Sequence, residues 1–134
     1  MSIASETTPK IEFISPLVGL EEHRSFELEP LDEDGLFFTM RSTSDPSLQL
    51  VVADPMPFYP DYEPMIDGDT ARSLEIVDEK DGAVLAVVNM QGGAEKATMN
   101  LLAPIVLNPK AHRATQAVLY GKDQPLDAPL VRKD

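Results

Sequence analysis

The sequence predicts an all-β fold, mainly antiparallel, in the form of a small barrel-like or sandwich domain with one or two short helices. Apolar residues recur mostly at every second position in short runs, which is typical of strands with one buried face. Pro, Gly and Asp separate these runs, as expected for turns between strands. A chain of 134 residues fits one core, so we expect a single domain spanning residues 1–134.

The first half of the chain begins with a predicted hairpin. Phe26 and Leu28 alternate with acidic residues, and residues 36–40 resume the alternation after an acidic turn at 32–35. The apolar run at residues 48–53 does not alternate, which predicts a strand buried on both faces.

The middle of the chain is less regular. Four prolines between residues 54 and 69 predict an ordered loop, and the aromatic rings within it indicate that the loop is packed. Asp69 is predicted to cap a short helix over residues 70–76. A second hairpin is predicted to pair residues 74–77 with residues 83–90.

The last third is densely apolar and predicts strands at residues 97–102, 105–107 and 116–120. Asn100 and Asn108 bracket its central run. A buried amide must satisfy both its donor and its acceptor end, so these residues either end strands in turns or belong to a binding surface. The tail at residues 121–134 is polar and broken by prolines, and we expect it to be extended or frayed.

No residue pattern predicts catalysis. The absence of Cys excludes disulfides, thiol chemistry and zinc sites built on sulfur. His23 and His112 are far apart in the sequence and lack the spacing of metal ligands. The acidic runs at residues 21–22, 32–34 and 78–81 lack the alternate-residue spacing of a calcium loop, and the last two are predicted hairpin tips. We therefore expect no enzyme, no metal and no cofactor.

The charge balance indicates the kind of partner. Eleven Lys and Arg residues against 23 Asp and Glu residues give a net charge of −12. This charge disfavours direct binding of nucleic acid and favours a basic protein partner, and its self-repulsion favours a monomer. The chain shows no signal-peptide pattern and no apolar run long enough to span a membrane, so we expect a cytoplasmic protein.

Three stretches resemble the family of flagellar assembly factors called FliW. They read "ADPMPFYPDYE", "LEIVDEKDGAVLAVVNM" and "TMNLLAPIVLN", and together they lie within the region from Leu48 to Leu119. The third is the most specific, because the family reads Thr-x-Asn-Leu-x-x-Pro-Ile/Val-x-x-Asn and then Gln-x-Val-Leu. The opening segment "FISPLVGLEE" departs from the family phrase at Pro16 and Val18, which predicts a different first turn.

The resemblance implies a protein that works by binding. Members of the family sequester CsrA, a basic RNA-binding repressor of translation, and also bind flagellin, so that secretion of flagellin frees the factor to relieve repression of flagellin mRNA. The alternative is a cytoplasmic flagellin chaperone without a CsrA partner. We expect acidic residues of one loop to steer the repressor and Tyr62 to anchor it. The predicted partner-binding residues are Phe58, Asp61, Tyr62, Glu63, Asn100 and Asn108.

Overall fold

The computed structural model describes residues 10–15, 17, 19–64, 66–90, 92–119 and 125–130. These residues contain nine strands, one α-helix and two short 3-10 helices. The strands are β1 (Lys10–Phe13), β2 (Ser25–Pro30), β3 (Phe37–Ser42), β4 (Gln49–Ala53), β5 (Ala83–Asn89), β6 (Thr98–Met99), β7 (Ile105–Asn108), β8 (Arg113–Gln116) and β9 (Ala128–Pro129). The helices are α1 (Gly68–Ser73), η1 (Glu79–Asp81) and η2 (Ala94–Lys96).

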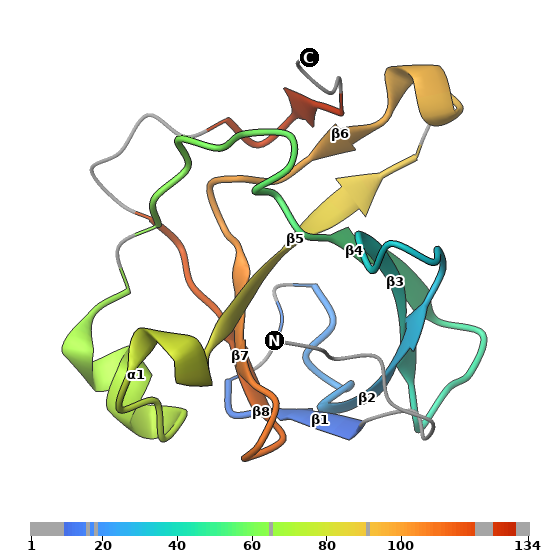
Figure 1. Cartoon of the computed structure of the whole chain (residues 1–134). Coiled ribbons are helices and arrows are strands. Elements are labelled where there is room, and N and C mark those ends of the chain that lie inside the picture. Colours follow the sequence, from blue (N-terminus) through green and yellow to red (C-terminus); the bar gives the residue numbers. More distant parts are fainter. Residues whose placement is uncertain are drawn as a thin grey trace.

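Seven of the strands close into a barrel (Figure 1). The order β4-β3-β2-β1-β8-β7-β5 is completed by pairing of β4 with β5, which brings Val52 opposite Val87. The neighbours in this ring are antiparallel except β1 and β8, which are parallel. The predicted all-β fold is confirmed, in its barrel form.

Alternation along the strands fills the barrel. In the first hairpin, Phe26 and Leu28 of β2 are buried, and Leu28 lies opposite Met40 of β3. The rings of Phe13 and Phe26 meet edge to face with their centroids 5.4 Å apart. The other buried residues of this core are Ile11, Leu17, Phe38, Val52, Leu85, Ile105, Leu107 and Ala114.

A second core lies on the outer side of β4 and β5. Leu85 belongs to the barrel core, whereas its neighbour Ala86 belongs to the outer cluster, because successive strand residues point to opposite faces. In β4, Val52 belongs to the barrel core and Ala53 to the outer cluster. The end of β4 is therefore buried on both faces, as predicted. The outer cluster also contains Phe58, Tyr62, Val88, Ala97, Met99, Leu101, Leu119 and Ala128.

The short strands β6 and β9 extend the sheet beyond the barrel, above it in Figure 1. Met99 of β6 lies between Val88 of β5 and Ala128 of β9. Residues 125–130 of the predicted tail are thus described and include a strand whose Ala128 is buried. Residues 121–124 and 131–134 lie outside the described residues.

The helix begins earlier than predicted. Its N-cap is Asp67, whose carboxylate accepts a hydrogen bond of 2.7 Å from the backbone N–H of Thr70. Asp69 lies instead in the first turn, where it pairs with Arg72. The prediction that Asp69 is the cap was therefore wrong, because both residues have the chemistry of a cap and the sequence offered two registers.

The predicted strand at residues 74–77 is wrong. Leu74 is the C-cap of α1, and Glu75 adopts φ 60°, a left-handed conformation that no strand residue uses. Hydrogen bonds from Ile76 N to Ala71 O (2.8 Å) and from Glu75 N to Arg72 O (3.0 Å) form the Schellman ending of a helix. The second hairpin is therefore replaced by pairing of β5 with β4, β6 and β7.

The strands of the last third are also displaced from their predicted bounds. The predicted strand at 97–102 shrinks to β6, because the chain turns at Asn100, and β8 ends at Gln116, where the predicted strand at 116–120 begins. Backbone hydrogen bonds from Ala117 N and Leu119 N continue the pairing, and Tyr120 lies outside the described residues. Pro16 and Val18 of the altered first turn also lie outside them, while Gly19 takes φ 83° there.

Candidate functional site

The proline-rich loop between β4 and α1 is ordered and packed, as predicted. Backbone hydrogen bonds from Phe58 N to Pro55 O (3.1 Å) and from Tyr62 N to Tyr59 O (3.0 Å) form successive turns. The ring of Phe58 is buried and meets Phe37 edge to face at a centroid distance of 6.0 Å. The loop therefore lies over the outer core as a fixed surface.

Tyr62 attaches this loop to the segment after β6. Its side chain is 5% exposed, and its hydroxyl donates a hydrogen bond of 2.7 Å to the carbonyl oxygen of Leu101. Burial raises the pKa of Tyr62 to about 12. The structure thus brings Tyr62 next to the segment that contains Asn100, and the protein's own chain encloses the side chain that was predicted to anchor a partner.

Asp61 and Glu63 flank this buried tyrosine and are both exposed. No ion pair joins either carboxylate to a cation among the described residues. Beside them lies a shallow groove of about 300 Å³, lined by residues 58–62, Leu101 and Pro125. The loop therefore presents negative charge that no described cation pairs, next to an apolar hollow.

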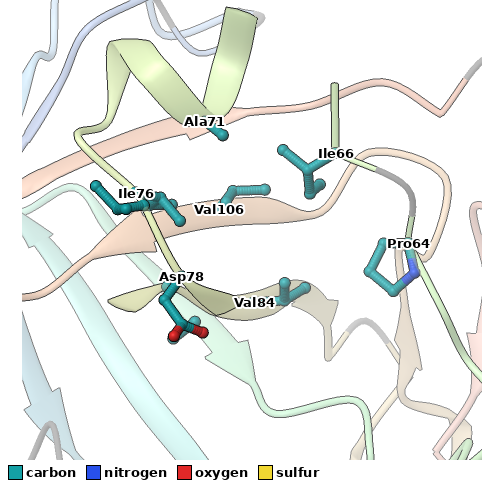
Figure 2. Close-up of a pocket in the computed structure, with 10 residues that line it drawn as sticks. Pro64, Ile66, Ala71, Ile76, Asp78, Val84 and Val106 are labelled. Atoms are coloured by element: carbon teal, nitrogen blue, oxygen red, sulfur yellow. The ribbon is translucent and has the colours of Figure 1, made fainter. Parts of the chain in front are cut away.

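A larger groove of about 470 Å³ lies beneath α1 (Figure 2). Its floor is the cross-strand pair of Val84 on β5 and Val106 on β7. We call it the α1 groove. Its aliphatic lining consists of Pro64, Ile66, Ala71, Ile76, Val77, Ala83, Val84 and Val106. The only charged residue that lines it, within the described part of the chain, is Asp78.

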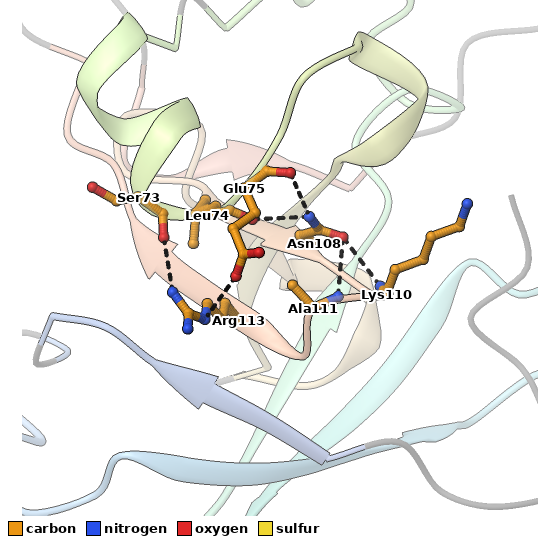
Figure 3. A network of polar contacts seen from close by, with 7 residues as sticks. All are labelled: Ser73, Leu74, Glu75, Asn108, Lys110, Ala111 and Arg113. Carbon is orange, nitrogen blue, oxygen red and sulfur yellow. Dashed lines mark hydrogen bonds and ion pairs between the residues drawn. The ribbon is translucent and has the colours of Figure 1, made fainter.

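Asn108 holds the end of α1, directly before the groove residue Ile76. Figure 3 shows its contacts. Its side-chain nitrogen donates to Leu74 O (2.8 Å) and Glu75 O (3.1 Å), where α1 ends. Its side-chain oxygen accepts from the backbone N–H groups of Lys110 (3.1 Å) and Ala111 (3.3 Å). The amide is 4% exposed and each of its hydrogen-bonding positions is used, so it supports the turn interpretation of this residue.

An ion pair and a hydrogen bond from Arg113 of β8 reinforce the same helix end. Arg113 lies 3.4 Å from the carboxylate of Glu75 and 3.5 Å from the carbonyl oxygen of Ser73. The first contact holds Glu75, which has the left-handed conformation, and the second holds the last residue of α1 (Figure 3).

Asn100 supports a turn of the same kind. Its side-chain oxygen accepts hydrogen bonds of 3.0 Å from the backbone N–H groups of Leu102 and Ala103. This turn directs the chain from β6 past Leu101 toward β7. The two asparagines therefore hold separate turns, Asn100 next to the outer core and Asn108 at the end of α1.

The two histidines make contacts within the fold. His23 Nδ1 lies 2.8 Å from the hydroxyl of Ser42, and His112 Nδ1 lies 2.9 Å from the carbonyl oxygen of Lys10. Among the described residues, no group of three or more His, Asp or Glu side chains is arranged to hold a metal ion. No helix in that part of the chain is long and apolar enough to cross a membrane.

Comparison with known proteins assigns this architecture to a family. The family model described as "FliW protein" matches residues 1–130. The chain belongs to the FliW family. The flagellar assembly factor FliW of Bacillus subtilis is 35% identical over 120 residues, covering 90% of this chain and 84% of its own length. That of Oceanobacillus iheyensis is 31% identical over 136 residues, covering 98% and 92%.

A solved structure agrees with the sequence relatives. The crystal structure of a flagellar assembly factor FliW superposes with a TM-score of 0.85 at 26% identity, covering 99% of this chain and 92% of that one. The barrel with its outer extension is thus an arrangement this chain shares with a FliW protein.

Sequence reasoning missed the α1 groove. Ile76 was assigned to a strand, and Ile66 and Val106 were not selected, because the groove joins residues that are far apart in the chain. One signal was available, namely the spacing of Ala71 and Ile76, which is that of the hydrophobic contact across a Schellman ending.

Proposed function

We propose that the chain is a cytoplasmic flagellar assembly factor that acts by binding two protein partners. One partner is a CsrA-type RNA-binding repressor, and the other is flagellin. Flagellin and the repressor compete for the chain, so that secretion of flagellin releases it to relieve repression of flagellin mRNA. The observation that carries the proposal is membership of the FliW family across residues 1–130, whose relatives bear the name flagellar assembly factor.

The charge of the chain supports a basic partner. A net charge of −12 attracts a basic repressor over a distance of about 10 Å at moderate salt, and it accelerates encounter. It also repels the phosphates of RNA, so the chain acts on the repressor and not on the message. Because like charges also repel a second copy, we propose that the chain binds as a monomer.

The loop at residues 54–64 supports a division of roles among the predicted partner-binding residues. Asp61 and Glu63 are exposed and unpaired within the described region, which suits direct contact with a cation of the repressor. The buried residues Phe58 and Tyr62 hold the loop in place. Asn100 and Asn108 hold the turns on either side and so support this surface.

Isothermal titration of the full chain with the CsrA-type regulator of its own organism tests the proposal. The titration is repeated with flagellin already bound to the chain. We expect tight binding to the regulator that saturating flagellin abolishes. The test variant combines Asp61→Asn with Glu63→Gln, which removes two negative charges from the loop. The matched control combines Glu33→Gln with Asp34→Asn, which removes two negative charges from the β2–β3 turn.

Each outcome separates the alternatives. Loss of affinity in the Asp61, Glu63 double variant with an unchanged control supports the loop as the contact surface. Binding of flagellin without any binding of the regulator would favour the flagellin chaperone. Absence of binding to both partners would contradict the proposal.

A further inference from the structure

The proposed contacts with the repressor lie on the loop at residues 54–64 and leave the α1 groove unassigned. The lining of this groove is almost wholly aliphatic. Val106 is 2% exposed at its floor, whereas Val77 at its edge is 95% exposed. The groove therefore leads from a buried valine to a fully solvated one. Its volume of about 470 Å³ lies within the range of about 300–1,000 Å³ that is usual for ligand sites.

The walls of the groove are fixed in position. The Schellman ending of α1 sets Ile76 over the floor, and Asn108 binds the carbonyl oxygens of Leu74 and Glu75 immediately before it. On the other side, the carboxylate of Asp81 accepts hydrogen bonds from the backbone N–H groups of Val77 (3.3 Å) and Asp78 (3.0 Å). A hollow held in this way exists before any ligand binds, which lowers the entropic cost of binding.

The segment that surrounds the groove is strongly acidic. Residues 61–81 contain eight Asp and Glu residues against one Arg and one Lys, a net charge of −6 out of the −12 of the whole chain. Asp69 pairs with Arg72, and Asp78 lies 3.9 Å from Lys80. Glu75 pairs with Arg113 of β8. Asp78 lines the groove itself, and the net negative charge of the segment that supplies most of the lining complements a ligand with an aliphatic centre and cationic ends.

We infer that the α1 groove binds a short segment of a partner protein in which bulky aliphatic side chains are flanked by Lys or Arg. The aliphatic side chains lie on Val84 and Val106, and the cationic residues lie toward Asp78 and the acidic residues before α1. A small molecule fits less well, because the lining supplies one carboxylate and no converging set of polar groups to orient it.

The inference rests on the proposed function, since it names the chemistry by which a basic partner is recognised. Its test does not require that partner. Failure of the peptide experiment below, with successful titration of the regulator, would remove the groove assignment alone. The reverse result would remove the choice of regulator and leave the groove in place.

The experiment uses the full chain with isotope-labelled isoleucine methyl groups and the synthetic peptide Lys-Lys-Leu-Ile-Leu-Lys-Lys, blocked at both ends. We expect saturable shifts of the Ile66 and Ile76 methyl signals in NMR spectra. The methyl signal of Ile11, buried inside the barrel, should stay unchanged. Two comparison peptides, Glu-Glu-Leu-Ile-Leu-Glu-Glu and Lys-Lys-Ser-Asn-Ser-Lys-Lys, should each bind about ten-fold more weakly or not at all.

Two pairs of variants locate the site. Val77→Lys places a cation at the groove edge and should weaken peptide binding about ten-fold, whereas Leu31→Lys makes the same change at another exposed position and should leave it within about two-fold. Asp78→Asn should weaken binding about three-fold, and Asp34→Asn in the β2–β3 turn should not. All four altered positions are exposed, so the variants should fold.

Several results would overturn the inference. Equal binding of the serine-containing basic peptide would reduce the effect to general charge attraction. Equal loss in Val77→Lys and Leu31→Lys would place the binding elsewhere. Shifts of Ile66 and Ile76 on raising the protein concentration without peptide would assign the groove to a second copy of the chain.

Discussion

Asn108 connects two segments of the chain through one amide. It holds the end of α1 with its nitrogen and the turn after β7 with its oxygen. Replacing Asn108 by Ala leaves carbonyl and N–H groups in this buried region without a partner, so we expect a loss of about 1–3 kcal/mol in the free energy of unfolding. Urea denaturation followed by circular dichroism measures this loss.

Asn100→Ala is the control for this prediction. Asn100 is half-buried and accepts two hydrogen bonds from the backbone of the described residues. We therefore expect the loss of stability on Asn100→Ala to be smaller, about 1 kcal/mol. If Asn108→Ala kept the stability of the parent protein but abolished binding of the regulator, the residue would belong to the interface instead.

Tyr62 makes the stability depend on pH at alkaline values. Burial raises its pKa to about 12 in the folded state, against roughly 10 in the unfolded chain. Between these values the unfolded chain loses the phenolic proton and the folded protein retains it. The stabilisation from Tyr62 is therefore complete below pH ~10 and is lost as the pH rises toward ~12.

The variant Tyr62→Phe isolates this effect. It removes the hydrogen bond to Leu101 O, so we expect about 1 kcal/mol lower stability at pH 8. The variant should also lose less stability than the parent between pH 9 and pH 11, in urea titrations at each pH. Parallel pH profiles for the two proteins would show that Tyr62 is not buried from solvent in the folded state.

The sequence shows which residue types are unusual, but it does not show what surrounds each side chain in the fold. The aromatic and amide residues were recognised as unusual from the sequence. An interface anchor and a core residue have the same composition, however, so the sequence could not show that Tyr62 faces Leu101 of its own chain. For Asn108, the sequence left a turn and a binding surface open, and its contact with Leu74, 34 residues away, supports the turn.

At the scale of elements, we expect β9 to contribute to the stability of the fold. Ala128 is 1% exposed between β6 and the outer core, although it belongs to a proline-rich tail. Ala128→Asp would bury a carboxylate without a partner, and we expect a loss of about 2–3 kcal/mol in the free energy of unfolding. Leu126→Asp is the matched control, because Leu126 is 61% exposed. The urea concentration at which this variant is half unfolded should stay close to that of the parent protein.

Equal stabilities of these two variants would show that β9 does not contribute to the fold. Such a result would separate the outer extension from the barrel. Further links of this segment are hydrogen bonds from Leu101 N to Pro125 O (3.0 Å), from Leu130 N to Ala97 O (3.1 Å) and from the Tyr59 hydroxyl to Pro129 O (2.5 Å).

Local elements could be predicted where neighbours in the sequence determine them. The β2–β3 hairpin was predicted correctly, because alternation and an acidic turn are both local signals. The segment at residues 74–77 was not, because Glu75 takes a left-handed conformation that is rare for residues other than glycine. Contacts from Asn108 and Arg113, far along the chain, hold it there, and no local pattern reports them.

At the scale of the whole molecule, closure of the barrel depends on pairings that are distant in sequence. The sequence predicted strands and left barrel and sandwich open, since alternation shows which face is buried but not which strands meet. Two contacts decide between them, β1 with β8 and β4 with β5. The groove beneath α1 depends on a third pairing, β5 with β7, which brings Val84 and Val106 side by side.

Charge acts at this same scale and determines how partners arrive. Opposite fields raise the association rate, and salt screens them over about 8 Å at physiological ionic strength. Raising the salt concentration should therefore slow association of the CsrA-type regulator more than it speeds dissociation, in surface-plasmon or stopped-flow measurements. The double variant at Asp61 and Glu63 should flatten this salt dependence more than the double variant at Glu33 and Asp34 does. The reason is that Asp61 and Glu63 lie at the proposed contact. An association rate that does not respond to salt would refute electrostatic steering, and equal flattening by both double variants would attribute it to net charge alone.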